Sequence, residues 1–265
     1  MLISQPAFEQ QVPAFRDSQP NTFEAVRPMM EHFLSVARDQ MAVPEDYANQ
    51  PLLEAYVYKN AAAESVPSLD LILTDSGFAV VSNQNLAPAS RERVAALLNS
   101  LRRQASDARD LLLLDLCKTN WVSSQQCTLV RSTLLWCPML ARRYGIAINE
   151  NDPQGDFLLH LPTIEQASEM ATNIIGQPLM DFLIAHQDEY SENPAYILVR
   201  ESTRKYMSAV VQQNRRAVEA QRQYILKKIE LLAEELPEYK ESSTYRAAHA
   251  KGYENKPEDP TFFFA

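Results

Sequence analysis

The stretch Ser68-Leu-Asp-Leu-Ile-Leu-Thr-Asp-Ser-Gly-Phe-Ala-Val-Val-Ser82 decides how the chain is organised, because it is the one place where the pattern changes. Leu69–Thr74 and Phe78–Ser82 are short apolar runs that favour β-strands, and Asp75-Ser76-Gly77 has the composition of a turn. Two such runs joined by a few residues that include glycine predict a hairpin. We therefore expect one β-hairpin over about residues 69–82.

Helical patterns lie on both sides of this hairpin. Apolar residues recur at helical spacing over residues 90–116. About 26 residues at ~1.5 Å each form a rod of roughly 39 Å, and such a helix often spans between neighbouring molecules or lines an interface. Similar patterns cover residues 22–41 and 51–67, and Pro28 inside the first of these indicates a helix start or a kink.

The segment over residues 120–156 has the least regular pattern. Residues 129–144 are typical of a helix bent at Pro138, and residues 146–148 of a short strand. Residues 149–155 are rich in turn-forming types and therefore mark the domain boundary that we expect.

Two features predict helix starts in the second half. Thr163 and Gln166 have the spacing of a capping box, which predicts a helix that begins there and runs to about Ile184. Pro194 suits the first position of a later helix, and the helical pattern that follows ends at Pro237.

These patterns together predict a mostly α fold: a helical bundle with long helices, one inserted β-hairpin and extended termini. We expect an extended N-terminal arm over residues 1–21, a helical domain over 22–156, a second helical unit over 157–238 and an extended C-terminal tail over 239–265. Weak similarities between the halves are consistent with an internal duplication, and chance similarity is an equal alternative.

The net charge of −9 bears on the choice of partners. An acidic chain repels nucleic acid and anionic membranes, although a local basic face remains compatible with this charge. No window reaches the ~18–20 apolar residues of a membrane span, and the first residues lack a secretory signal. We expect a soluble intracellular protein whose three cysteines, Cys117, Cys127 and Cys137, are small apolar residues in a reduced chain.

The sequence contains no familiar constellation for catalysis. Neither a G-x-S-x-G motif, a phosphate loop nor a G-x-G-x-x-G motif occurs. The four histidines are scattered and have no metal-ligand spacing, so we expect no enzyme activity, catalytic residue, cofactor or metal. Basic residues concentrate over 90–109 and 200–228. They could face an acidic neighbour or DNA, but interleaved charges on a solvated helix are the simpler interpretation.

The run from Asp70 to Val94 resembles a family encoded among the virion genes of tailed phages and prophages of gut bacteria. The pattern of that family is D-L-x-L-T-x-x-G-F-x-V-V-S-N-x-N-x-A-P-A-S-x-x-R-V, and the chain matches most of it. The resemblance extends over most of the chain. In helical content and an inserted hairpin, the chain is also similar to head-to-tail connector (adaptor) proteins, which dock as a ring beneath the portal.

The resemblance implies a structural virion protein that forms a homo-oligomeric ring, a dodecamer, between portal and tail. Its partners would be the portal protein and other connector or tail proteins, with DNA passing through the channel and no membrane. The protein would be made in the host cytoplasm and reside at the neck, or portal vertex, of the virion. The family implies no active site. The expected interaction residues are Asp70, Asp75, Gly77, Phe78, Asn83, Arg91, Arg93, Phe262, Phe263 and Phe264.

Two other classes of function remain open at this point. One is a transient assembly, scaffolding or regulatory binding protein without enzymatic activity, which would be absent from mature virions. The other is a phage enzyme or processing factor, which requires a pocket that contains titratable groups with shifted pKa values.

Overall fold

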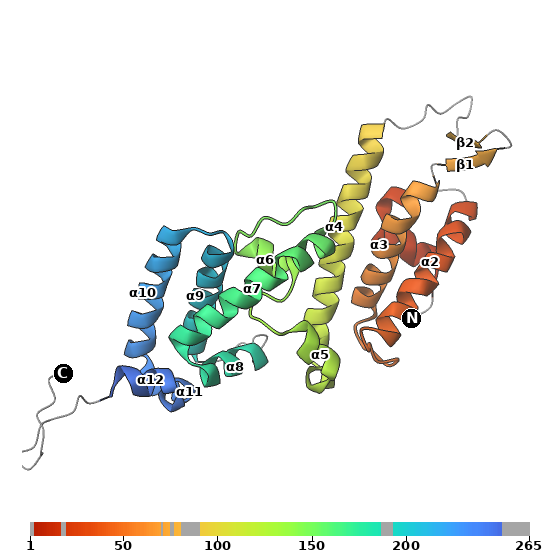
Figure 1. Ribbon diagram of the computed structural model, residues 1–265. Helices are drawn as coiled ribbons and strands as arrows, with labels where there is room; N and C mark the ends of the chain where they lie inside the picture. Colours follow the sequence, from red (N-terminus) through yellow and green to blue (C-terminus); the bar gives the residue numbers. More distant parts are fainter. Residues whose placement is uncertain are drawn as a thin grey trace, which may run out of the picture. The chain divides into compact units, whose positions relative to one another are not determined.

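The computed structural model describes residues 3–16, 20–69, 71–74, 77–80, 91–186 and 193–250, and this part of the chain is mostly helical, as expected (Figure 1). The chain divides into two compact units, Met1–Pro162 and Thr163–Ala265. The division falls inside one helix, α7 (Pro153–Ile175), whereas the sequence places it in the loop over residues 149–155.

The first unit contains six α-helices before α7, two short 3₁₀ helices and two strands within its described residues. The helices are α1 (Gln5–Gln11), α2 (Pro20–Asp39), α3 (Gln50–Leu69), α4 (Arg91–Leu116), α5 (Gln125–Val130) and α6 (Pro138–Arg143). The 3₁₀ helices are η1 (Pro13–Phe15) and η2 (Asn120–Ser123), and the strands are β1 (Leu71–Thr74) and β2 (Gly77–Val80).

Helix α3 is the centre of this unit and packs against α1, α2 and α4. Its sequence explains this position, because buried side chains occur on all of its faces. Large residues such as Leu53 and Tyr58 fill the core, and the run Ala61-Ala62-Ala63 has the small side chains that bring neighbouring helices close.

Within the described residues 3–16, the chain forms a docked helix, which corrects the extended arm expected over residues 1–21. Phe8 of α1 is 1% exposed, and its ring lies 5.1 Å from Phe15 and 5.7 Å from Tyr58 of α3. The backbone N–H of Ser4 also donates to the Tyr58 hydroxyl at 3.2 Å. A seven-residue helix is marginal by itself, so burial of these aromatic rings stabilises it.

The strands β1 and β2 pair antiparallel, with Leu71 opposite Val80 and Thr74 opposite Gly77. The turn residues Asp75 and Ser76 expected between them lie outside the described residues, as do residues 81–90. Helix α4 then begins at Arg91 and ends at Leu116, which confirms the long helix expected over this stretch.

The segment over residues 120–156 differs from the expectation. The single bent helix over residues 129–144 is wrong, because α5 and α6 are separate and residues 131–137 between them are not helical. Residues 146–148 form no strand; Ile146 and Ile148 are buried in irregular backbone instead. Apolar side chains at alternate positions therefore indicate burial here without strand pairing.

The second unit contains the rest of α7, then α8 (Gln177–Ala185), α9 (Pro194–Val211), α10 (Arg215–Leu231), η3 (Ala233–Glu235), α11 (Pro237–Glu241) and α12 (Ser243–Ala248). The predicted helix start at Thr163 is wrong, because α7 continues through Pro162. Pro194 does begin α9, as expected, and the Asn193 side chain caps it by accepting from Ala195 N–H at 2.8 Å.

The end of the described chain is also helical, which corrects the extended tail expected from residue 239 onward. Tyr239 of α11 is 2% exposed, and Ser242 caps α12 by accepting a hydrogen bond from the backbone N–H of Tyr245 at 3.0 Å. Residues 251–265, which complete the predicted tail, lie outside the described residues. The internal duplication is not tested by these elements and stays a prediction.

Candidate functional site

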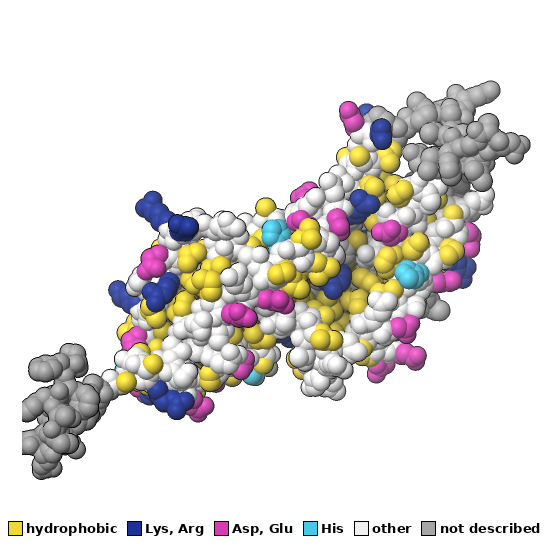
Figure 2. Space-filling model, in the orientation of Figure 1, with side chains coloured by type: hydrophobic (Ala, Val, Ile, Leu, Met, Phe, Trp, Pro, Cys, Tyr) yellow, Lys and Arg dark blue, Asp and Glu magenta, His cyan; other side chains and the backbone are white. Residues whose placement is uncertain are grey.

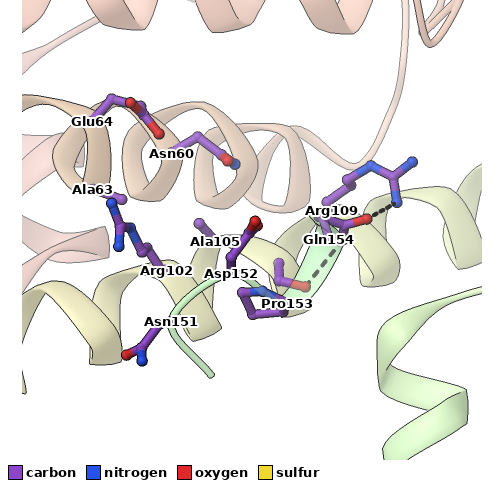
Figure 3. A pocket seen from close by; sticks show the side chains of 11 residues that line it. Asn60, Ala63, Glu64, Arg102, Ala105, Arg109, Asn151, Asp152, Pro153 and Gln154 are labelled. Atoms are coloured by element: carbon purple, nitrogen blue, oxygen red, sulfur yellow. Dashed lines mark hydrogen bonds between the residues drawn. The ribbon is translucent and has the colours of Figure 1, made fainter. Parts of the chain in front are cut away.

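A polar pocket of about 490 Å³ lies in the first unit between α3, α4 and the segment that enters α7 (Figure 3). Helix α3 contributes Asn60, Ala63 and Glu64 to its wall. Helix α4 contributes Arg102, Ala105, Ser106 and Arg109, and residues 151–154 close the third side.

The spacing of these residues explains why the helices leave a hollow. The α4 wall has spacing i, i+3, i+4, i+7, and the α3 wall has spacing i, i+3, i+4, so each set occupies one helix face. Small side chains, Ala63 on α3 and Ala105 and Ser106 on α4, stand at the middle of each face. The longer Arg102 and Arg109 flank the gap that these small residues leave.

Gln154 links the two walls of α4 and α7 at one end of the pocket. Its side-chain amide donates to Ser106 Oγ at 3.1 Å, and its Oε1 accepts from Arg109 at 3.2 Å. Asp152 fixes the start of α7, because its Oδ1 accepts from Gly155 N–H at 3.0 Å. These bonds hold the pocket segment in place.

Next to the pocket residue Arg109, the buried carboxylate of Asp110 joins α4 to α6. Asp110 is 0% exposed; its Oδ2 accepts from Met139 N–H at 2.9 Å, and its Oδ1 lies 3.5 Å from Arg109 Nη1. Burial raises the pKa of Asp110, although the Met139 N–H and Arg109 act to lower it. Asp110 is thus engaged in positioning α6.

The thiol next to this carboxylate is not set up as a nucleophile. Cys137 is 0% exposed, and its pKa is raised, first by burial and then by the negative charge of Asp110. A reactive cysteine instead needs an exposed site that stabilises the thiolate. Cys117 and Cys127 are also buried, and the structure pairs none of the three in a disulfide.

The pocket offers hydrogen bonds and charges rather than a set of catalytic groups. Neither a histidine nor a cysteine occurs among the described residues that line it. Arg102 and Glu64 face it without a hydrogen-bond or ion-pair partner within the described part of the chain. One cation and one anion are therefore available to a polar ligand or to a side chain of another protein.

The histidines lie apart and have local partners. His186 hydrogen-bonds the carbonyl of Phe182 at 2.9 Å, and His160 lies 3.8 Å from Asp156. Over the described ranges, no group of three or more His, Cys, Asp or Glu side chains could hold a metal ion. Within the same ranges, none of the helices is both long and apolar enough to cross a membrane.

A second feature of the first unit is the start of α4, which projects beyond the end of α3 (Figure 1). The buried residues of α4 begin only at Leu101, and none of the residues from Arg91 to Ser100 is buried. Val94, Leu97 and Leu98 lie at i, i+3 and i+4 in this part and form one apolar stripe. Leu97 is 37% exposed.

The structure describes four of the interaction residues expected from the sequence, and it places them on two elements. Gly77 and Phe78 are in β2, opposite Thr74 and Leu73, and Arg91 and Arg93 are exposed in the first turn of α4. Outside the described residues lie Asp70, Asp75, Asn83, Phe262, Phe263 and Phe264.

Sequence reasoning missed the pocket, although part of its signal is present in the sequence. One face of the helix over residues 102–109 carries, in order, an arginine, an alanine, a serine and an arginine. Two small residues between two arginines suggest a hollow between two cations. The third wall could not be predicted in this way, because residues 151–154 are distant in sequence and lie in the turn-rich stretch over 149–155, which predicts a domain boundary.

Comparison with known proteins gives one match, and it covers the centre of the first unit. Residues 45–130 match the model of a family of unknown function (DUF6712). This range contains α3, both strands, α4 and α5, hence two of the three walls of the pocket and the projecting start of α4. No curated protein and no solved structure matches the chain.

Proposed function

We propose that the protein is a structural virion protein, a subunit of the head-to-tail connector ring that docks between the portal and the tail of a tailed phage. The observation that carries this proposal is the projecting start of α4. Ten residues, Arg91–Ser100, continue the helix beyond the last buried turn. A monomer gains little from such an extension, whereas a neighbouring subunit can cover its apolar stripe.

The chemistry of this stripe suits a protein neighbour. Val94, Leu97 and Leu98 form its apolar centre, and the exposed Arg91 and Arg93 stand beside it. An apolar centre with a charged border is the usual composition of a protein interface. The resemblance over Asp70–Val94 ends at the first residue of this stripe, so the pattern and the stripe are adjacent in the chain.

The assembly test uses the full chain. We expect the purified protein to form rings visible by electron microscopy, and we expect Leu97→Asp to shift it toward the monomer in sedimentation velocity. Ala96→Asp is the matched control, because Ala96 is exposed, adjacent and off the stripe. A wild-type protein that stays monomeric up to high concentration, or equal effects of the two variants, would contradict the role of the stripe.

The particle test separates the connector from the runner-up function. Electron microscopy of the virions that contain this protein should locate the chain as a ring at the portal vertex, and the images would count the subunits. Presence in assembling particles and absence from mature virions would instead support a transient assembly or scaffolding protein.

A further inference from the structure

Helix α10 differs in charge from the rest of the chain. It carries the basic residues Arg215, Arg216, Arg222, Lys227 and Lys228 and the acidic residues Glu219 and Glu230, a formal charge of +3. Because the whole chain has −9, the remainder carries −12. Figure 2 shows Lys and Arg side chains gathered over α10.

One face of α10 has no neighbour within the described residues. Ile225 and Ile229 are its buried residues, and the helix packs against α9 and η3. On the opposite side, Arg216, Ala220, Lys227 and Leu231 are exposed and recur at spacings that keep them on one face. We call this set, together with the adjacent Tyr224, the α10 face.

The acidic residues of α10 do not neutralise this face, since they have other partners. Glu219 accepts from Gln223 at 2.7 Å and lies 3.9 Å from Arg222, and Glu230 lies 2.8 Å from His249 Nε2. Among the described residues, Arg216 and Lys227 have no ion-pair partner. Their charges are therefore available to a second molecule.

Exposed apolar area accompanies these cations. Leu231 is 74% exposed and Tyr224 is 43% exposed, at the same edge of the face. DNA binding by a helix requires contacts to phosphates, which leucine cannot supply. An apolar anchor and a tyrosine between basic residues instead match the composition of protein interfaces.

We infer that the α10 face docks onto an acidic surface of a second copy of this chain. A second copy is complementary to this face in charge, because outside α10 each copy carries −12. A contact between a basic helix and a different, acidic surface is heterologous, and heterologous contacts with the right rotation close into rings. The inference thus rests on the proposed ring and names one of its two contacting surfaces.

Self-association by this face has a distinct dependence on salt. Exposed charges are screened beyond roughly 8–10 Å at physiological ionic strength, so the contact weakens as salt is added. The apolar part at Leu231 is not screened in this way. The oligomer should therefore lose affinity with salt without dissociating as completely as a purely ionic complex.

The first test reverses one charge in the full chain. Lys227→Glu should weaken self-association on the order of tenfold in sedimentation velocity at low salt, and should flatten its salt dependence. Lys205→Glu in α9 is the control, because Lys205 is exposed and the substitution changes the net charge equally. Circular dichroism should show unchanged helix content for both variants.

The second test removes the apolar anchor. Leu231→Ser should weaken self-association several-fold, whereas Leu129→Ser in α5 should not; the two leucines are 74% and 71% exposed in the wild type. Zero-length carbodiimide cross-linking of a mixture of ¹⁴N-labelled and ¹⁵N-labelled protein then identifies the contact, because a cross-linked peptide pair that carries both labels joins two copies. We expect Lys227 joined to a carboxylate of the other copy.

The outcomes distinguish this inference from the proposed function. Rings that form equally well with Lys227→Glu would overturn the α10 contact and leave the ring intact. A wild-type chain that is monomeric at every salt concentration would overturn both. If Lys227→Glu lowers retention of duplex DNA in a gel-shift assay but leaves self-association unchanged, the partner of the α10 face is DNA and the inference is wrong.

Discussion

The carboxylate of Asp110 accepts a hydrogen bond from the backbone N–H of Met139 at 2.9 Å, so a side chain of α4 satisfies the first turn of α6. The last turns of α4 are thereby tied to a short helix that has no side-chain cap of its own. The long helix is rigidly anchored at this end, while its other end projects.

Replacing this carboxylate should destabilise the protein. Asp110→Ala leaves the partly buried Met139 N–H without its acceptor, and we expect a loss of about 1–3 kcal/mol in the free energy of unfolding. Asp110→Asn keeps an acceptor oxygen and should cost less. Urea denaturation at neutral pH measures both; equal losses would mean that the shape of the side chain matters and the hydrogen bond does not.

The same residue predicts a pH dependence. Burial raises the pKa of Asp110 above its usual 3.8, so the folded state binds this proton more tightly than the unfolded state. Its contribution to stability is complete below the unfolded pKa and falls as the pH rises through the folded pKa. Relative to the wild type, Asp110→Asn should therefore gain stability from pH 4 upward, measured by denaturation at a series of pH values.

The pair of Tyr47 and Asp115 predicts a pH dependence of stability opposite to that of Asp110. The Tyr47 hydroxyl donates to Asp115 Oδ2 at 2.6 Å. Partial burial acts to raise the pKa of Asp115, but hydrogen bonds from Tyr47 and Asn49 outweigh it and lower the pKa below 3.8. The stability from this pair is therefore present above the unfolded pKa and is lost as the pH falls through the folded pKa.

Tyr47→Phe should cost about 1 kcal/mol at neutral pH, because it removes one hydrogen bond to a carboxylate. The difference from the wild type should shrink in acid, where Asp115 is protonated in both proteins. Thermal unfolding at neutral and acidic pH checks this, with Tyr224→Phe as the control at an exposed tyrosine. A constant difference across pH would contradict the assignment to Asp115.

Gly176, between α7 and α8, should not tolerate a side chain. Its φ is +84°, and an added Cβ would lie 2.4 Å from Ser242 Cβ, just before α12. We expect Gly176→Ala to lose at least about 2 kcal/mol, from backbone strain and from the collision. Gly145→Ala shares a positive φ of 86° at an exposed position and should lose only about 1 kcal/mol.

Trp121 provides a test of how η2 is attached to the end of α2. Its buried indole Nε1 donates to the carbonyl of Met41 at 2.8 Å, and the next residue, Ala42, has a positive φ of 53°. Trp121→Phe should cost about 1–3 kcal/mol, because the carbonyl loses its donor and a cavity forms. Chemical denaturation followed by circular dichroism measures the loss.

The sequence predicted the elements whose signals are local. Helix α4 has a long apolar repeat, and the start of α9 has both an asparagine cap and a proline at the first position. The fold class follows from such signals. For the strands, only the residues over 71–74 and 77–80 are described, and these two segments pair antiparallel.

Prolines account for one kind of error. Pro28, Pro67 and Pro162 all lie inside helices, although proline usually marks a boundary. In α7, Phe157 before Pro162 and Ile164 after it are both buried, so tertiary burial on each side of the proline stabilises the helix despite the lost hydrogen bond. Local rules for helix starts cannot include this burial.

Long-range contacts account for the other kind of error. The polar segment over residues 1–21 is typical of a free arm, yet Phe8 becomes buried against Tyr58, more than forty residues away, and Phe15 packs against Phe8. The pocket could not be predicted from the sequence for the same reason, because Gln154 reaches Ser106 and Arg109 only after folding. No local pattern in the sequence predicts these long-range contacts.

The central position of α3 limits which truncations of the first unit can fold. Helices α1, α2 and α4 all contact α3, and Phe8 covers the ring of Tyr58. Removal of residues 1–15 would therefore uncover the central helix to water and would not simply shorten a dispensable leader. A recombinant fragment limited to residues 45–130, the range of the family match, would lose α1 and α2, two of the three helices that pack against α3, and should aggregate.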